Sequence, residues 1–177
     1  MKHITDYLEK EQVTQLLECA RACSLRDYLM LRILWRTGIR VSELLNIRLQ
    51  DIEAHNQVVN IVKAKGGKQR RVLLDIETLD MLAKYVLDTK TPEDNPIFPL
   101  SSVWVWQLVK KYARLAGIGD SVHPHTLRHS HAIHLVRKGA DIRRVQLLLG
   151  HSSLNTTSTY LRFKEADLLE MYNTIEF

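Results

Sequence analysis

The chain has 177 residues, 45% of them hydrophobic, and its 25 lysine and arginine residues exceed its 20 aspartate and glutamate residues, giving a formal net charge of +5. This length allows one well-buried core and predicts a single domain, while the basic charge favours a polyanionic partner, although an ordinary basic protein would show it too. No apolar run reaches the ~20 residues of a membrane span and the start, MKHITDYLEKEQ, has no signal-peptide pattern, so we expect a cytoplasmic protein without a membrane partner.

The first half of the chain predicts helices followed by a β-hairpin. Apolar residues recur at helical spacing from Val13 to Trp35, and a Thr-Gly pair ending at Gly38 interrupts the pattern. A short helix is expected over residues 40–46. The segment 57–74, QVVNIVKAKGGKQRRVLL, has β-branched residues on both sides of two adjacent glycines. It predicts an antiparallel hairpin with a basic tip.

The second half predicts mostly helices. A helix around residues 79–87 precedes a proline-containing loop, TPEDNPIFP, and a longer helix follows from Ser101 toward Gly117. The apolar face expected for that longer helix comprises Val105, Leu108, Val109, Tyr112 and Leu115, and its basic face comprises Lys110, Lys111 and Arg114. Three further helices are expected over 124–138, 142–149 and 165–174. The predicted fold class is therefore α+β, mostly helical, with one small antiparallel sheet.

The segment TGIRVSELLNI holds a candidate ion pair. Arg40 and Glu43 are three residues apart, so on a helix they would share a face while Val41, Leu44 and Leu45 turn inward. A carboxylate at this spacing can orient a guanidinium. The alternative interpretation is a surface ion pair with little energetic consequence.

The hairpin tip KAKGGKQRR concentrates positive charge around a flexible turn. Its cations are Lys63, Lys65, Lys68, Arg70 and Arg71. The turn could approach a phosphate chain closely, and a lysine there could donate a proton. The alternative is a solvated edge whose lysines discourage strand aggregation.

The segment HPHTLRHSHAIH predicts an anion site at a helix start. His125 and Arg128 are three residues apart at the end of the helix where free amide groups and the dipole attract anions. The spacing of His125 and His129 also suits a zinc pair, but no carboxylate follows the HExxH pattern, so we expect no metal. We also expect Cys19 and Cys23, which have no second cysteine pair, to be reduced packing residues.

A candidate nucleophile lies near the end of the sequence. In LLGHSSLNTTSTYLRF, His151 follows the glycine that ends a predicted helix, and Tyr160 follows nine residues later. A tyrosine in such a segment is usually an amphipathic packing residue. Its phenol, with a pKa of about 10, becomes a nucleophile only beside cations that favour the phenolate.

Taken in order, these segments resemble the tyrosine recombinase, or phage integrase, family over almost the whole chain. The family's TGxRxSEL segment corresponds to Arg40 and Glu43, and its KGxKxR turn corresponds to Lys65. The family's remaining motifs, the HxLRH box, the LGH box and the nucleophile, fall on His125, Arg128, His151 and Tyr160. The resemblance implies one tyrosine-recombinase catalytic domain over residues 1–177.

The resemblance also implies the chemistry. Tyr160 would attack a scissile phosphodiester and leave a 3′-phosphotyrosine and a free 5′-hydroxyl, without a metal or cofactor. Charge arguments suit Arg40 and Arg128 as clamps on the non-bridging oxygens. The other implied roles are a hydrogen bond from His151, proton exchange with the tyrosine by His125, general acid catalysis by Lys65, and support of Arg40 by Glu43. The partner would be double-stranded DNA, with Lys63, Lys68, Arg70, Lys110 and Lys111 as further contacts.

The chain departs from the family pattern in three ways. Typical members carry an N-terminal helical domain that completes a clamp around DNA, and we expect that domain to be absent here. Leu73 stands where a proline is common, and His131 stands where an aromatic residue is common. The last segment forms an apolar stripe of Leu168, Leu169, Tyr172 and Ile175, which either packs on its own core or docks on a neighbouring protomer within a DNA-bound tetramer.

Three rival functions stay open at this point. A type IB topoisomerase shares the tyrosine chemistry but rejoins the same strand. A DNA-binding regulator could use this fold without catalysis. A histidine-metal hydrolase would lose activity with a chelator, whereas a recombinase would not.

Overall fold

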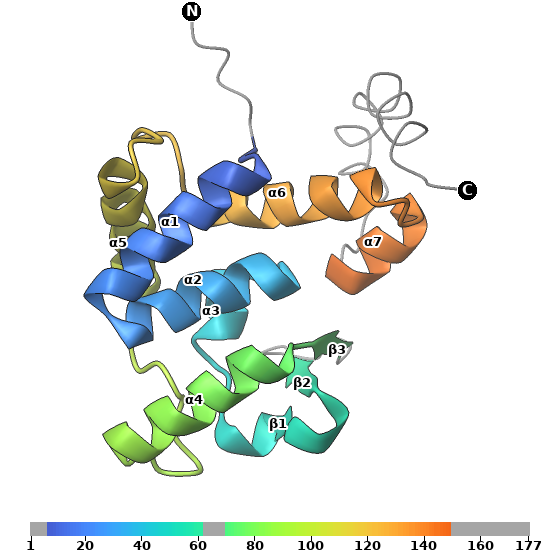
Figure 1. Cartoon of the computed structure of the whole chain (residues 1–177). Helices are drawn as coiled ribbons and strands as arrows, with labels where there is room; N and C mark the ends of the chain where they lie inside the picture. The colour runs from blue at the N-terminus through green and yellow to red at the C-terminus, as the bar shows by residue number, and fades with distance from the viewer. Residues whose placement is uncertain (1–6, 62–69, 150–177) are drawn as a thin grey trace, which may run out of the picture.

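The computed structural model describes residues 7–61 and 70–149, and it consists mainly of helices, with a small sheet at one side of the molecule (Figure 1). In chain order the helices are α1 (Lys10–Cys23), α2 (Leu25–Thr37), α3 (Val41–Leu44), α4 (Ile76–Thr89), α5 (Ser102–Leu115), α6 (Pro124–Arg137) and α7 (Ile142–Leu149). Two 3-10 turns, η1 (Leu49–Asp51) and η2 (Ala54–Asn56), flank the first strand. The expected mostly helical α+β class is confirmed.

The sheet has three antiparallel strands in the order β1 (Ile52–Glu53), β2 (Val58–Ile61) and β3 (Arg70–Leu73). Strands β2 and β3 form the predicted hairpin, with Val58 opposite Leu73 and Ile61 opposite Arg70. Strand β1 was not predicted. The tip of the hairpin, 62–69, lies outside the described residues.

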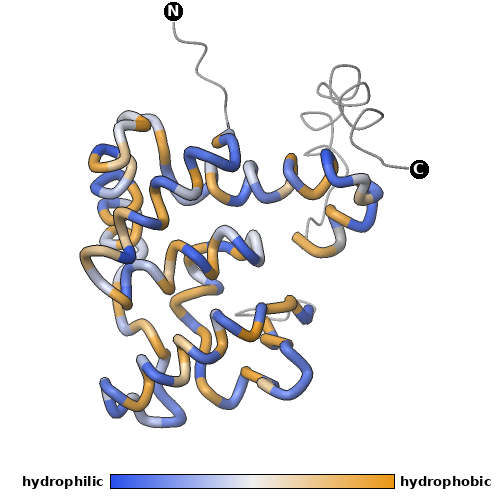
Figure 2. The backbone as a smooth tube through the Cα atoms, viewed as in Figure 1, coloured by the Kyte–Doolittle hydropathy of each residue, from blue (hydrophilic) through white to orange (hydrophobic). Residues whose placement is uncertain are grey.

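Helix α2 is the centre of the molecule, since it contacts α1, α3, α4 and α6. Most of its residues are buried, and one continuous core joins them to α1, α5 and the inner side of the sheet. Hydrophobic and hydrophilic residues alternate along the helices around it, as expected for helices that bury one face (Figure 2). Helix α7 packs on α6 through a small separate cluster of Ala132, Val145 and Leu149.

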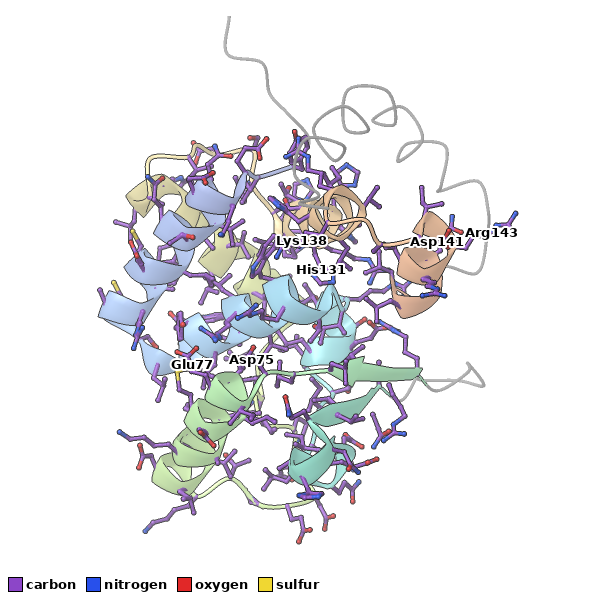
Figure 3. All side chains as sticks on the ribbon, turned by 45° about the vertical axis from the view of Figure 1, so that its right-hand side comes forward. Asp75, Glu77, His131, Lys138, Asp141 and Arg143 are labelled. Atoms are coloured by element: carbon purple, nitrogen blue, oxygen red, sulfur yellow. The ribbon has the colours of Figure 1, made fainter. Side chains whose placement is uncertain are left out.

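A buried arginine joins α2 to α4. The Arg32 guanidinium donates hydrogen bonds to the Tyr28 hydroxyl at 2.6 Å, to Thr78 Oγ1 at 2.7 Å and to Asp75 Oδ1 at 2.9 Å. Figure 3 shows Asp75 and Glu77 where α4 begins beneath α2. These bonds satisfy a cation that burial alone would penalise, and they fix α4 and the adjoining end of β3 against the central helix.

Local signals explain most helix ends, and the structure extends or corrects three expectations. Helix α4 begins before residue 79 because the Asp75 side chain accepts a hydrogen bond from the Thr78 amide at 3.1 Å. Leu115, expected on the buried face of α5, is 58% exposed, and Ala113 is buried instead. The expected helix over 40–46 shortens to α3, with Arg40 as its N-cap. Among the described residues, no helix combines the length and apolarity that crossing a membrane requires.

Candidate active site

The Arg40–Glu43 pair forms at the start of α3, through a capping geometry. Glu43 Oε2 accepts a hydrogen bond from the Arg40 amide at 2.8 Å, and Glu43 Oε1 accepts one from Arg40 Nη1 at 3.1 Å. The Glu43 side chain is only 7% exposed, whereas that of Arg40 is 39% exposed. The carboxylate therefore lies inside and holds a guanidinium that reaches the surface.

Arg70 is the other partner of Glu43. Its Nη1 and Nη2 donate to the two oxygens of Glu43, each at 2.7 Å, and its Nε donates to the Leu148 carbonyl at 3.0 Å. Burial alone would raise the pKa of Glu43, but the hydrogen bonds from Arg70 and Arg40 outweigh it and lower this pKa to about 2. Glu43 is therefore an anion at neutral pH and is not available as a proton donor.

The side chain of Arg128 is buried where α2, α6 and α7 meet. Its Nη1 donates to the Gly38 carbonyl, and its Nη2 donates to the Leu149 carbonyl at 2.7 Å. Gly38 lies two residues before Arg40, and Leu149 directly follows the acceptor of Arg70. Arg40, Glu43, Arg70 and Arg128 are thus brought together from α3 and its N-cap, from β3 and from α6, around the end of α2 and the end of α7.

His125 is exposed in the first turn of α6, one turn before Arg128. Its ring meets His123 edge-on with 6.1 Å between centroids, and His123 in turn stacks on Trp106 of α5 at 5.0 Å. His123 Nδ1 also accepts a hydrogen bond from the Thr126 amide at 3.3 Å, so it caps α6. The aromatic stack and the cap hold the helix start that carries His125.

His131 occupies the interior behind these cations. Figure 3 places it between α6 and α2. Its Nε2 has no hydrogen-bond partner among the residues described. Desolvation by burial, helped by the nearby charge of Arg128, outweighs a hydrogen bond with the Trp35 backbone and lowers the pKa of His131 to about 4. The folded protein therefore keeps this ring neutral at mildly acidic pH.

We expect His131 to lower the free energy of unfolding as the pH falls. The His131 ring binds a proton near pH 6.5 in the unfolded chain but only near pH 4 in the folded protein, so the free energy of unfolding rises with pH across this interval. Between about pH 7.5 and about pH 5 the free energy of unfolding should drop by about 2 kcal/mol through this residue. Urea unfolding measured at both pH values checks it, and His131→Phe should remove that drop.

His125→Phe is the matched control, because His125 is exposed. Glu43 does not obscure the measurement, since its lowered pKa affects stability only below about pH 4.5. An unchanged pH dependence in the His131→Phe protein would contradict the expectation.

Several candidate residues lie outside the part of the chain that the structure describes. These are Lys63, Lys65, Lys68, His151 and Tyr160. Two expected DNA contacts on α5 are placed: Lys110 Nζ lies 6.0 Å from the centre of the Trp106 ring, and Lys111, which is exposed, lies 4.8 Å from that of Tyr112. Within residues 7–61 and 70–149, no three histidine, cysteine, aspartate or glutamate side chains are grouped as metal ligands.

Arg70 differs from its expected place. The sequence grouped it with the exposed cations of the hairpin tip, but its side chain is 11% exposed and bound to Glu43. The neighbouring Arg71 does point outward, is 60% exposed and pairs with Glu53. Alternation along a strand accounts for the difference, because successive side chains point to opposite faces.

Comparison with known proteins gives consistent matches. A family model described as the phage integrase family matches residues 6–166. A tyrosine recombinase of Pseudothermotoga lettingae is 39% identical over 178 residues, covering 98% of this chain and 62% of the relative. The tyrosine recombinase XerA of Pyrococcus furiosus is 36% identical over 179 residues, covering 96% of this chain and 61% of the relative. The chain thus spans less than two thirds of the length of these curated relatives.

Solved structures agree with the sequence matches. The crystal structure of XerA recombinase superposes with a TM-score of 0.84 at 30% identity, covering 100% of this chain and 66% of that one. The XerH site-specific recombinase, solved in a pre-cleavage complex with its difH substrate, superposes with a TM-score of 0.79 at 27% identity. That match covers 97% of this chain and 53% of XerH. In both structures the similarity extends over nearly the whole chain.

Proposed function

The chain belongs to the phage integrase family of tyrosine recombinases, and from that premise we propose that it is a site-specific DNA recombinase whose residues 1–177 form the catalytic domain. Tyr160 attacks a scissile phosphodiester, and the 5′-hydroxyl of another strand later displaces it from the 3′-phosphotyrosine. The energy of the broken bond is kept in the protein–DNA link, so rejoining needs no ATP. Double-stranded DNA is the partner, in line with the bound substrate of XerH.

The observation that carries this proposal is the convergence of the Arg40–Glu43 pair with Arg128, which is far from that pair in the sequence. The Arg40 guanidinium reaches the surface, while the Glu43 carboxylate that binds it is buried. The Arg128 guanidinium is held by hydrogen bonds to two backbone carbonyls. Guanidinium groups held in this way can bind phosphate oxygens and stabilise the charge that develops on them. His125 exchanges a proton with the tyrosine, Lys65 protonates the departing oxygen, and His151 donates a further hydrogen bond.

Covalent trapping tests this function. We expect the protein, incubated without metal with nicked duplexes from its genomic neighbourhood, to form a slow-migrating adduct on denaturing gels, and Tyr160→Phe to form none. Without the phenol there is no group to make the phosphotyrosine bond, so the loss should be complete. An adduct that persists in Tyr160→Phe would show that the nucleophile is another residue.

We further propose that the chain assembles into a tetramer on DNA through its last segment. A groove of about 490 Å³ lies between α1, α2 and α6. Apolar residues Leu17, Trp35 and Leu135 are among its lining, together with basic residues. The basic members are Lys10, Arg21, Arg32, Arg36 and Lys138, with Glu18 as the acidic member. The C-terminal sequence EADLLEMYNTIEF combines apolar and acidic residues, so it is complementary to this groove of a second copy.

Truncation after Arg162 is expected to abolish assembly on DNA without preventing DNA binding, as measured by light scattering with and without a target duplex. Lys138→Glu, which reverses one charge of the groove, should weaken assembly in the intact chain. Lys84→Glu on α4 is the control, because this exposed lysine is not among the lining residues. Assembly that survives the truncation unchanged would contradict the exchange.

A further inference from the structure

Arg70 connects three parts of the site that are separate in the sequence. It is the first residue of β3, its guanidinium binds Glu43 at the start of α3 with two hydrogen bonds, and its Nε binds the carbonyl of Leu148 in the last turn of α7. These partners are 27 and 78 residues away along the chain. One planar side chain therefore sets the relative positions of the hairpin, of α3 and of α7.

Resting on the proposed function, we propose that Arg70 is a positioning residue for DNA cleavage, which acts by holding Glu43 against Arg40 and by holding the end of α7. It does not contact DNA. Glu43 is the intermediary, because each of its oxygens accepts one hydrogen bond from Arg70 and one from Arg40. Without Arg70, the buried carboxylate would lose two of its four hydrogen bonds and would no longer fix the Arg40 guanidinium in one orientation.

The carbonyl contact extends this role to the other side of the site. Carbonyls in the last turn of a helix lack partners within the helix, and Arg70 and Arg128 supply donors to two successive ones, at Leu148 and Leu149. His151 follows two residues after Leu149 in the sequence. Arg70 therefore holds the helix turn that precedes the LGH box, as well as the carboxylate that binds Arg40.

Lysine could not replace this arginine. An ammonium group is a point charge with three donors, whereas the two parallel bonds to a carboxylate and the third bond to a carbonyl require the planar fork of a guanidinium. Arg70→Lys should therefore restore only part of what Arg70→Ala loses. Arg71→Ala is the matched control, since Arg71 is the next residue of β3 and carries its ion pair at the surface.

The first test separates positioning from DNA contact. In single-turnover cleavage of the nicked duplex, Arg70→Ala should lower the rate of adduct formation by about 100-fold, the cost of a small misplacement at a reacting centre. The dissociation constant for DNA and its salt dependence should stay unchanged. A contact to a phosphate predicts the opposite, weaker DNA binding and a salt slope reduced by about one. That result, or a normal cleavage rate, would overturn the proposal.

A neutral substrate tests whether the effect passes through the phosphate clamp. Replacing a non-bridging oxygen of the scissile phosphate by a methyl group removes the charge that Arg40 would bind. On this substrate the difference between wild type and Arg70→Ala should shrink by at least about tenfold, because less charge needs stabilising. A general loss of folded protein would lower the rate of Arg70→Ala by the same factor on the charged and on the neutral substrate. An unchanged ratio of wild-type to Arg70→Ala rates on the two substrates would therefore count against Arg70 as a positioning residue.

Hydrogen exchange tests the same contact without any reaction. The Arg40 amide, bound to Glu43 Oε2, should exchange about tenfold faster in Arg70→Ala, while amides of α1 keep their rates. Unchanged exchange at residues 39–45 would overturn the proposed link between Arg70 and Arg40. Because this measurement needs no DNA, it tests the link between Arg70 and Arg40 even if the wild-type protein forms no adduct, so failure of this inference and failure of the proposed function can be told apart.

Discussion

Arg128→Ala is expected to lower the rate of adduct formation by about 10³-fold, and at the same time to lower the free energy of unfolding by about 2–3 kcal/mol. The first effect follows from its proposed role, since removing one donor to a developing oxyanion typically costs this much. The second follows from its two buried hydrogen bonds, because the carbonyls of Gly38 and Leu149 would each lose a charged donor. Single-turnover cleavage and urea unfolding measure the two effects separately.

Arg128→Lys distinguishes the two contributions. Lysine keeps the positive charge but cannot bind both carbonyls with one planar group, so we expect it to recover part of the stability and little of the cleavage rate. DNA affinity should change much less than the rate in both variants, because the Arg128 side chain is buried. An Arg128→Ala protein that cleaves within about tenfold of wild type would exclude this residue as a clamp on the phosphate.

The sequence predicted most helices because their signals are local. Periodic apolar residues, glycines at helix ends and polar capping residues lie within a few positions of the element they define. Strand β1 gave no such signal, since its two residues become a strand only by pairing with β2. Leu115 matched the apolar pattern of α5 because it is a leucine, but in this last turn it is Ala113 that packs in the core, while Leu115 is exposed.

Contacts within the site could be predicted only where the two residues lie in the same short sequence motif. Arg40 and Glu43 are neighbours in the sequence, so their spacing already indicated an ion pair. The partners of Arg70 could not be read in this way, because Glu43 and Leu148 approach it only after the hairpin and α7 have packed. His131 was one of five histidines in a short segment, and only the packing of α6 against α2 shows that it is the buried one among His123, His125 and His131.

Gly38→Ala is expected to destabilise the fold by about 3 kcal/mol, although it adds a single methyl group. Gly38 ends α2 with φ +62°, a left-handed conformation that strains any residue with a Cβ. A Cβ built there would lie 2.6 Å from Leu149 Cδ2 and 2.7 Å from His131 Cδ2. Relief of these contacts must displace the Leu149 and His131 side chains of α7 and α6. Arg128 on α6 then shifts relative to the Gly38 carbonyl that holds it, so adduct formation should fall as well.

Gly117→Ala provides the comparison that isolates packing from backbone strain. Gly117 has a similar φ of +67°, but a Cβ there would meet no atom within 4 Å. We therefore expect a cost of only about 1 kcal/mol in urea unfolding, the strain of the left-handed conformation alone, and normal cleavage. Equal costs for the two substitutions would mean that strain, and not the close approach of α2, α6 and α7, accounts for the glycine at position 38. A larger cost at Gly38, accompanied by slower cleavage, would instead show that this close approach sustains both the core and the position of Arg128.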